Sequence, residues 1–205
     1  VYKRQANADA GTSKQVLLSG YTLGGSDAGN YNLVSPGNLT ATINKANLTL
    51  EGSKVYDGTT AVAGSSLIAT GVAGQTFTVT GSGDTSNLAS KNVQNGSALS
   101  STTGLSVGTS TNGGLASNYN LLSTAGSSYA VTPASLTVSG ITAANKIYDG
   151  TNLAAINQAN AVLAGLIAGD QVTLLSTGTF DTADIGANKT VYPVSYTHLT
   201  LPTKA

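Results

Sequence analysis

A repeated phrase constrains this 205-residue chain more than any other feature. Lys54-Val55-Tyr56-Asp57-Gly58-Thr59-Thr60 returns 92 residues later as Lys146-Ile147-Tyr148-Asp149-Gly150-Thr151-Asn152. Two further phrases recur 88 residues apart and in the same order: 30–33 with 118–121, and 43–50 with 131–138. Phrases that recur in one order at nearly one spacing indicate tandem modules.

The spacing predicts one complete module flanked by parts of two others. Residues 45–133 form a complete central module of about 90 residues, near the lower range for an independent domain. Residues 6–44 match the C-terminal part of a module, and residues 134–193 match an N-terminal part. Residues 186–191 resemble residues 11–16, so near the end of the chain the repeat returns to the phrase with which it began.

Both ends of the chain resemble one DNA element read in opposite orientations. Residues 1–5 can be encoded by GTG TAT AAG AGA CAG, and the reverse complement, read in another frame, encodes 194–197. This string is similar to the transposon end used in sequencing-library adapters. We therefore interpret residues 1–5 and 194–205 as adapter-like scars and expect them to lack native packing.

Composition argues against several classes of protein. Without the two ends, six basic residues stand against nine acidic ones, and the only His and the only Arg are gone. The absence of a basic patch argues against a nucleic-acid partner. No apolar run approaches the roughly 18 residues of a membrane span. Because Cys is absent, a disulfide framework is excluded, although the compartment is not fixed by this.

The remaining pattern predicts an all-β fold. Charged residues are only 9% of the chain, and apolar residues recur at strand spacing among Gly, Ser, Thr and Asn. We expect tandem small β-sandwich or β-grasp-like modules, with a β-solenoid as the alternative. Strands are predicted at 16–18, 31–33, 39–43, 48–50, 76–80, 105–107, 119–122, 129–131, 171–175, 179–180 and 190–191.

One stretch permits two interpretations. The Ala, Leu, Asn and Gln content of 154–166 would allow a helix. The matching stretch of the central module, 60–70, is richer in Val, Gly and Ser. We therefore favour strand–loop–strand for 154–166.

The repeated phrases supply the candidate motif residues. Asp57-Gly58 signals a tight turn, because Gly accepts a positive φ without steric cost. We expect the ring of Tyr56 to pack and Asp57 to bond nearby backbone, with a binding or calcium role for Asp57 as the alternative. The full set of motif residues is Tyr56, Asp57, Gly58, Tyr148, Asp149, Gly150, Asn30, Tyr31, Asn118 and Tyr119.

Taken together, the phrases resemble the YDG-type repeats of large bacterial surface proteins, among them filamentous-haemagglutinin-like adhesins. The resemblance covers roughly 11–193 and includes Lys-x-Tyr-Asp-Gly-Thr, Gly-x-x-Lys-x-Val and the Asn-Tyr-x-Leu phrase. It implies an extracellular, all-β repeat array at the bacterial cell surface, and it carries no catalytic residue to this chain. The central module departs from the pattern, with Gly74-Gln75 where Gly169-Asp170 stands in the third.

Little catalytic chemistry is open to such a chain. Without the ends there is no His, Cys, Trp or Arg, which removes Ser-His-Asp and Cys-His catalysis and the usual zinc sites. A carboxylate pair at Asp181 and Asp184 is the remaining option, and these residues lie in a loop-like phrase. We expect no enzyme activity, no cofactor and no metal site.

The sequence therefore predicts a structural and adhesive repeat segment that acts as a stalk or display array. Its expected partners are neighbouring modules of the same chain. The alternative is a module that binds host or matrix glycans or proteins through loops such as 24–30 and 112–118.

Overall fold

The computed structural model describes residues 2–5, 7–20, 22–34, 37 and 39–194. The chain divides into two compact units, Val1–Pro133 and Ala134–Ala205, and each is described by itself. The described residues form β-strands joined by loops and short 3-10 turns, so the predicted all-β class is confirmed. They show small β-rich modules rather than a closed barrel or a solenoid. No helix among them is long and apolar enough to cross a membrane.

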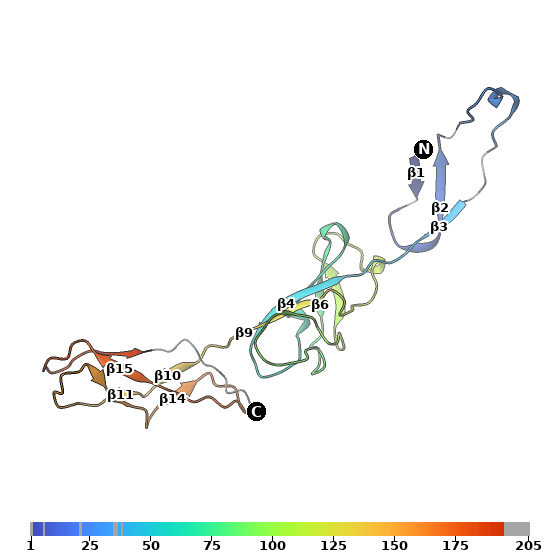
Figure 1. The fold of residues 1–205 in the computed structure, drawn as a ribbon. Coiled ribbons are helices and arrows are strands. Elements are labelled where there is room, and N and C mark those ends of the chain that lie inside the picture. The colour runs from blue at the N-terminus through green and yellow to red at the C-terminus, as the bar shows by residue number, and fades with distance from the viewer. Residues whose placement is uncertain (1, 6, 21, 35–36, 38, 195–205) are drawn as a thin grey trace, which may run out of the picture. The chain divides into compact units, whose positions relative to one another are not determined.

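A six-stranded sheet organises the central module (Figure 1). Its strand order is β7-β9-β4-β5-β6-β8. Within this sheet, β4 is the first strand along the chain and β9 is the last. These two strands pair in parallel, and the other neighbouring strands pair antiparallel. The strands are β4 (Thr49–Val55), β5 (Leu67–Thr70), β6 (Thr76–Thr80), β7 (Gln94–Ser97), β8 (Ser106–Ser110) and β9 (Ser128–Thr132).

Alternating side chains of these strands build the core. In β6, Phe77 and Val79 are buried while their neighbours are exposed or half-buried, as period-2 alternation predicts. The other buried apolar residues are Leu48, Leu50, Val62, Leu67, Ala69, Leu88, Leu99, Leu105, Tyr119, Tyr129 and Val131. Three 3-10 turns accompany the sheet: η2 (Gly64–Ser66), η3 (Val72–Gly74) and η4 (Ala116–Asn118).

A three-stranded sheet precedes the central module. Its order is β1-β2-β3, with β1 at Tyr2–Gln5, β2 at Gly11–Ser19 and β3 at Leu39–Ile43. The adapter-like residues 2–5 thus pair through their backbone with β2, because an open sheet edge accepts any extended segment. Residues 1 and 195–205 of the expected scars lie outside the described residues.

The strand predicted at 31–33 is wrong. The chain leaves the turn η1 (Ala28–Asn30) in an irregular conformation, and Tyr31 is 72% exposed. The matching segment 119–122 also lacks a strand and forms one isolated bridge, between Tyr119 and Ala46. Alternating Asn and apolar residues mimic a strand here, while the backbone of 118–120 bonds to the segment that joins two modules.

The second unit contains short paired strands. They are β10 (Thr137–Ser139), β11 (Thr142–Ala143), β12 (Leu153–Ala154), β13 (Ile156–Asn157), β14 (Val162–Ala164), β15 (Thr177–Phe180) and β16 (Val191–Val194). The preference for strand–loop–strand over 154–166 is confirmed. The strand predicted at 171–175 is wrong, for this segment is irregular. Its counterpart β6 is held between β5 and β8, whereas 171–175 pairs with no strand in the described part of the chain.

Candidate functional site

The ammonium group of Lys54 is the centre of the first repeated phrase. Its Nζ atom donates to Asp57 Oδ1 at 2.9 Å, to the carbonyl and hydroxyl oxygens of Thr59 at 2.9 and 3.0 Å, and to the carbonyl oxygen of Ala61 at 2.8 Å. Only 11% of the Lys54 side chain is exposed. Three N–H donors are thus shared among four oxygens that come from the loop after β4. We call this arrangement the clasp.

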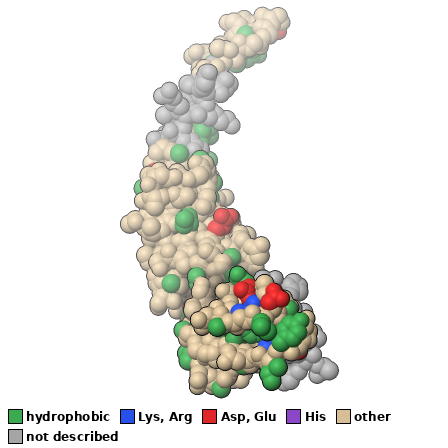
Figure 2. Space-filling view, turned by 90° about the vertical axis from the view of Figure 1, so that its left-hand side faces the viewer, with side chains coloured by type: hydrophobic (Ala, Val, Ile, Leu, Met, Phe, Trp, Pro, Cys, Tyr) green, Lys and Arg blue, Asp and Glu red, His purple; other side chains and the backbone are tan. Residues whose placement is uncertain are grey.

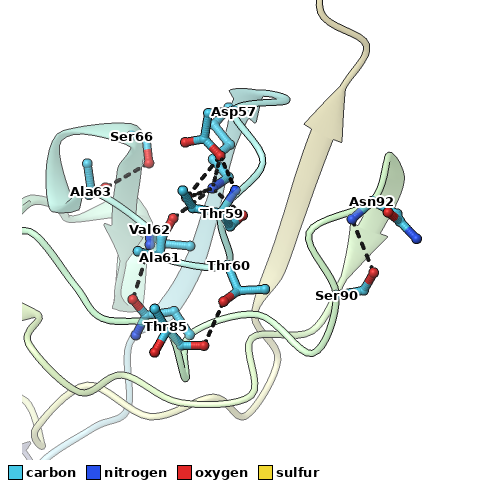
Figure 3. Close-up of polar contacts among 12 residues, drawn as sticks. Asp57, Thr59, Thr60, Ala61, Val62, Ala63, Ser66, Thr85, Ser90 and Asn92 are labelled. Carbon is cyan, nitrogen blue, oxygen red and sulfur yellow. Dashed lines mark hydrogen bonds and ion pairs between the residues drawn. The ribbon is translucent and has the colours of Figure 1, made fainter. Parts of the chain in front are cut away.

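Asp57 also forms hydrogen bonds within this loop. Its Oδ1 atom accepts the backbone N–H and the hydroxyl of Thr59, both at 2.9 Å (Figure 3). This is the Asx turn that Asp forms with backbone two residues on. Gly58, between the two residues, has a φ of +77°, which favours glycine. The carboxylate therefore serves the loop that carries it.

The second copy repeats this geometry. Lys146 Nζ donates to Asp149 Oδ1 at 2.7 Å and to the carbonyl and hydroxyl oxygens of Thr151 at 2.7 and 2.9 Å. Thr151 returns its N–H and hydroxyl to Asp149 Oδ1 at 2.9 Å each. In the space-filling view, blue Lys side chains lie between red carboxylates on a surface that is otherwise mostly uncharged (Figure 2). The Lys–Asp–Thr contacts are thus shared by the two copies, and Lys54 adds a bond to the carbonyl of Ala61.

The clasps hold both aspartates in the ionised form. Burial alone would raise the pKa of Asp57, but hydrogen bonds from Lys54 and Thr59 outweigh it and set the pKa below its ordinary value of 3.8. The hydrogen bonds from Lys146 and then Thr151 lower the pKa of Asp149 to about 2. At neutral pH neither carboxyl group can act as a proton donor.

The two tyrosines of the phrase lie in different surroundings. Tyr56 packs against the core, its N–H donates to the carbonyl of Thr132 at 2.8 Å, and Lys91 Nζ lies 5.7 Å from its ring centroid. Tyr148 is 64% exposed, so its ring does not share the packing of Tyr56. In the central module β9 pairs with the end of β4, whereas 144–150 forms no strand.

Tyr119 occupies a second structural site. Its ring is buried and meets Phe77 edge-to-face, with centroids 5.2 Å apart and planes at 69°. Its hydroxyl donates to Gln75 Oε1 at 2.7 Å and accepts the N–H of Val72 at 3.1 Å. The matching Tyr31 is exposed.

Asn118 connects the central module to the segment before β2. Its Nδ2 atom donates to Asp9 Oδ1 at 2.9 Å, and its Oδ1 atom accepts the N–H of Ala10 at 2.8 Å. Nearby, Ala46 in the link between modules exchanges backbone hydrogen bonds with the carbonyl of Asn118 and the N–H of Asn120, at 3.0 and 2.8 Å. The matching Asn30 is exposed at the end of η1.

A further lysine recurs in the Gly-x-x-Lys phrase. Lys189 Nζ lies 2.9 Å from Asp181 Oδ1 and donates to Thr182 Oγ1 at 2.7 Å. Lys14 Nζ donates to the carbonyl of Asp9 at 2.8 Å. Ser13 and Asn188, which precede these lysines, have φ values of 51° and 53°. The phrase therefore builds a tight turn fastened by its own lysine.

Asp181 is also one member of the possible carboxylate pair Asp181 and Asp184. The hydrogen bond from Lys189 lowers the pKa of Asp181, which is the opposite of the raised pKa of a glycosidase's general acid. A cavity of about 540 Å³ lies between the two lysine-fastened loops of the second unit, beside Lys146, Phe180 and Asp184. No cluster of three or more His, Cys, Asp or Glu residues that could hold a metal ion occurs in the described part of the chain.

Sequence reasoning missed Asn87, which is fully buried. Its Oδ1 atom accepts the N–H groups of Val62 and Asp84 at 3.1 and 2.8 Å, and its Nδ2 atom donates to the carbonyls of Ser101 and Thr103 at 3.2 and 3.1 Å. One amide thus joins three loops at the end of the sheet. Its only signal is an Asp-x-x-Asn spacing, which is common in ordinary loops.

The comparisons with known proteins come down to one family. The sequence profile of the YDG domain matches residues 4–40, 35–127 and 132–204. No curated protein and no solved structure matches the chain significantly.

Proposed function

The chain belongs to the YDG domain family, and we propose that it is a structural repeat segment of a large exported bacterial surface protein. In this proposal its modules act as a stalk or display array outside the cell. The chain has no enzymatic role in it, and the partners of each module are its neighbours in the same chain.

The proposal rests on the hydrogen bonds that both repeated aspartates form within their own loops. Asp57 Oδ1 and Asp149 Oδ1 each accept bonds from Lys and Thr of their own loop, so each carboxylate already serves to hold the loop that carries it. Recurrence of such a clasp in each module is what an array built from one structural unit requires.

Contacts around the link between modules add support. Asn118 bonds to Asp9 and Ala10, and Ala46 is held between Asn118 and Asn120. A linker whose backbone groups are hydrogen-bonded transmits position better than a free one. This favours a spacer over loosely tethered binding domains.

Duplication of the central module tests the spacer role. We would insert a second copy of residues 45–133 after Pro133 in the full chain and measure the maximum dimension by small-angle X-ray scattering. An increase close to the length of one module is expected. An increase no larger than that of a compact body with the added mass would contradict the proposal. Asn118→Ala, in both copies, is the control for the linker contacts.

A glycan- or matrix-binding module is the second candidate. The exposure of Tyr31, at 72%, beside the exposed Asn30 favours it, because an open ring next to amide groups suits sugar recognition. Arrays of glycans and matrix proteins probed with the full chain separate the two candidates. A stalk gives no specific binding, whereas binding that Tyr31→Ala abolishes would support the second. A panel of hydrolase substrates tests the absence of enzyme activity.

A further inference from the structure

The pairing of β4 with β9 has a direction that matters for a chain under tension. These are the first and last strands of the central module, and Figure 1 shows β4 (cyan) beside β9 (yellow). They pair in parallel over five residue pairs, from Glu51 with Ser128 to Val55 with Thr132. The chain therefore enters at the start of one strand and leaves at the end of the other.

This arrangement decides how a pull on the chain loads the hydrogen bonds. Because the strands are parallel, the start of β4 and the end of β9 lie at opposite ends of the pair. Tension between them slides the strands along each other and loads all their bonds together. If the strands were antiparallel, both ends would lie at one end of the pair, and tension would open the bonds one after another.

Further contacts extend the pair at its far end and hold the chain just before it. After the last residue pair, the N–H of Tyr56 donates to the carbonyl of Thr132 at 2.8 Å, and the Thr132 hydroxyl donates to the carbonyl of Lys54 at 3.3 Å. Before the first pair, the two backbone hydrogen bonds of Ala46 join the incoming chain to 118–120.

The pair also lies inside the sheet and over the core. Within the sheet, β7 pairs with the other edge of β9, and β5 pairs with the other edge of β4. Tyr129 of β9 is fully buried, and its hydroxyl lies 2.6 Å from the hydroxyl of Ser66. Sliding β9 past β4 would drag this ring and Val131 through a packed core, which raises the barrier to separation.

We propose that the β4–β9 pair is a mechanical clamp through which the module carries tension along the chain. The proposal rests on the spacer function above and deepens it: the load enters at Ala46, crosses from β4 to β9, and leaves at Pro133. Mechanical resistance depends on the barrier to unfolding rather than on equilibrium stability, so a module of modest stability can still carry load.

Single-molecule force measurements on the full chain test the clamp. The sequence contains no Cys, so two introduced cysteines are unique attachment points. Asn44→Cys with Pro133→Cys pulls the pair from opposite ends. Asn44→Cys with Ala125→Cys is the matched control, because Ala125 precedes β9 and both attachments then lie at the same end. All three positions are exposed.

We expect an unfolding force at least about twofold higher for the opposite-end attachment, because several bonds must fail together. Equal forces, or a lower force for that attachment, would overturn the clamp and leave the spacer proposal standing, since the latter is judged by scattering. Urea unfolding of each cysteine variant comes first. If Pro133→Cys shifts the midpoint, Ala134→Cys replaces it.

Discussion

The ring of Tyr119 lies against the α-carbon of Gly71. A Cβ atom on Gly71 would lie 2.4 Å from both Cζ and the hydroxyl oxygen of Tyr119, far inside contact distance. The ring cannot retreat easily, because Phe77 packs against it and Gln75 and Val72 hold its hydroxyl. Only glycine therefore fits at position 71 without displacing the Tyr119 ring.

Gly71→Ala should lower the free energy of unfolding of the central module by about 1–3 kcal/mol, the usual cost of overpacking a core. Denaturant unfolding of the full chain measures this change. Gly29→Ala is the matched control, because its Cβ would meet open space and its φ is not positive. Equal stability of the two variants would show that the ring moves freely.

Asn87→Ala should destabilise the central module by about 2–3 kcal/mol, because it leaves the N–H groups of Val62 and Asp84 without their acceptor in a buried position. The exposed Asn92 supplies the control Asn92→Ala, for which we expect a change within about 0.5 kcal/mol. The urea midpoint of each variant gives the comparison. A similarly small shift of the urea midpoint for both variants would contradict a stabilising role for Asn87.

Tyr56→Ala and Tyr148→Ala should differ, although the two residues stand in one repeated phrase. Removal of the half-buried Tyr56 ring is expected to cost about 2–3 kcal/mol. Removal of the exposed Tyr148 ring should change the unfolding of its unit little. The unfolding of each unit can be followed by hydrogen exchange of its own amides. Equal losses would mean that Tyr148 is covered in solution.

The clasp of Asp57 should make stability depend on pH in the acid range. The folded state lowers the pKa of Asp57 below 3.8, so protonation favours the unfolded chain. Its stabilising contribution is fully present above pH 3.8 and is lost as the pH falls through the lower folded value. The urea midpoints of wild type and Asp57→Asn should converge as the pH falls from 5 to 2. A constant difference over this range would rule out the carboxylate as the cause.

Much of the fold could be predicted from local pattern. Alternation of apolar residues located β6 and β9, where Phe77, Val79, Tyr129 and Val131 face the core. It failed at 31–33 and 171–175, because a strand also needs a neighbour to pair with, and alternation alone does not reveal that neighbour. Parallel pairing of β4 with β9 joins residues nearly 80 positions apart, which no local signal discloses.

The candidate site was predictable in its residues and only partly in its contacts. The repeat pointed to Asp57 and Gly58, whose turn follows from the chemistry of the Asp-Gly pair. The repeat did not reveal that Lys54 Nζ would donate to four oxygen atoms. Three of these belong to Thr59 and Ala61, and no rule for pairing residues along a sequence predicts those contacts. Burial of Asn87 likewise depends on loops that meet only in the folded chain.

The most direct test of the central claim, that the repeated Tyr-Asp-Gly phrase is structural, is urea unfolding of the full chain with Asp57→Ala. We expect a loss of about 1 kcal/mol in the free energy of unfolding of the central module. This is the worth of a turn hydrogen bond together with a half-exposed ion pair that solvent screens. Unchanged stability would contradict a structural role for the phrase, and a loss of binding to a surface ligand in the same variant would make Asp57 a binding residue.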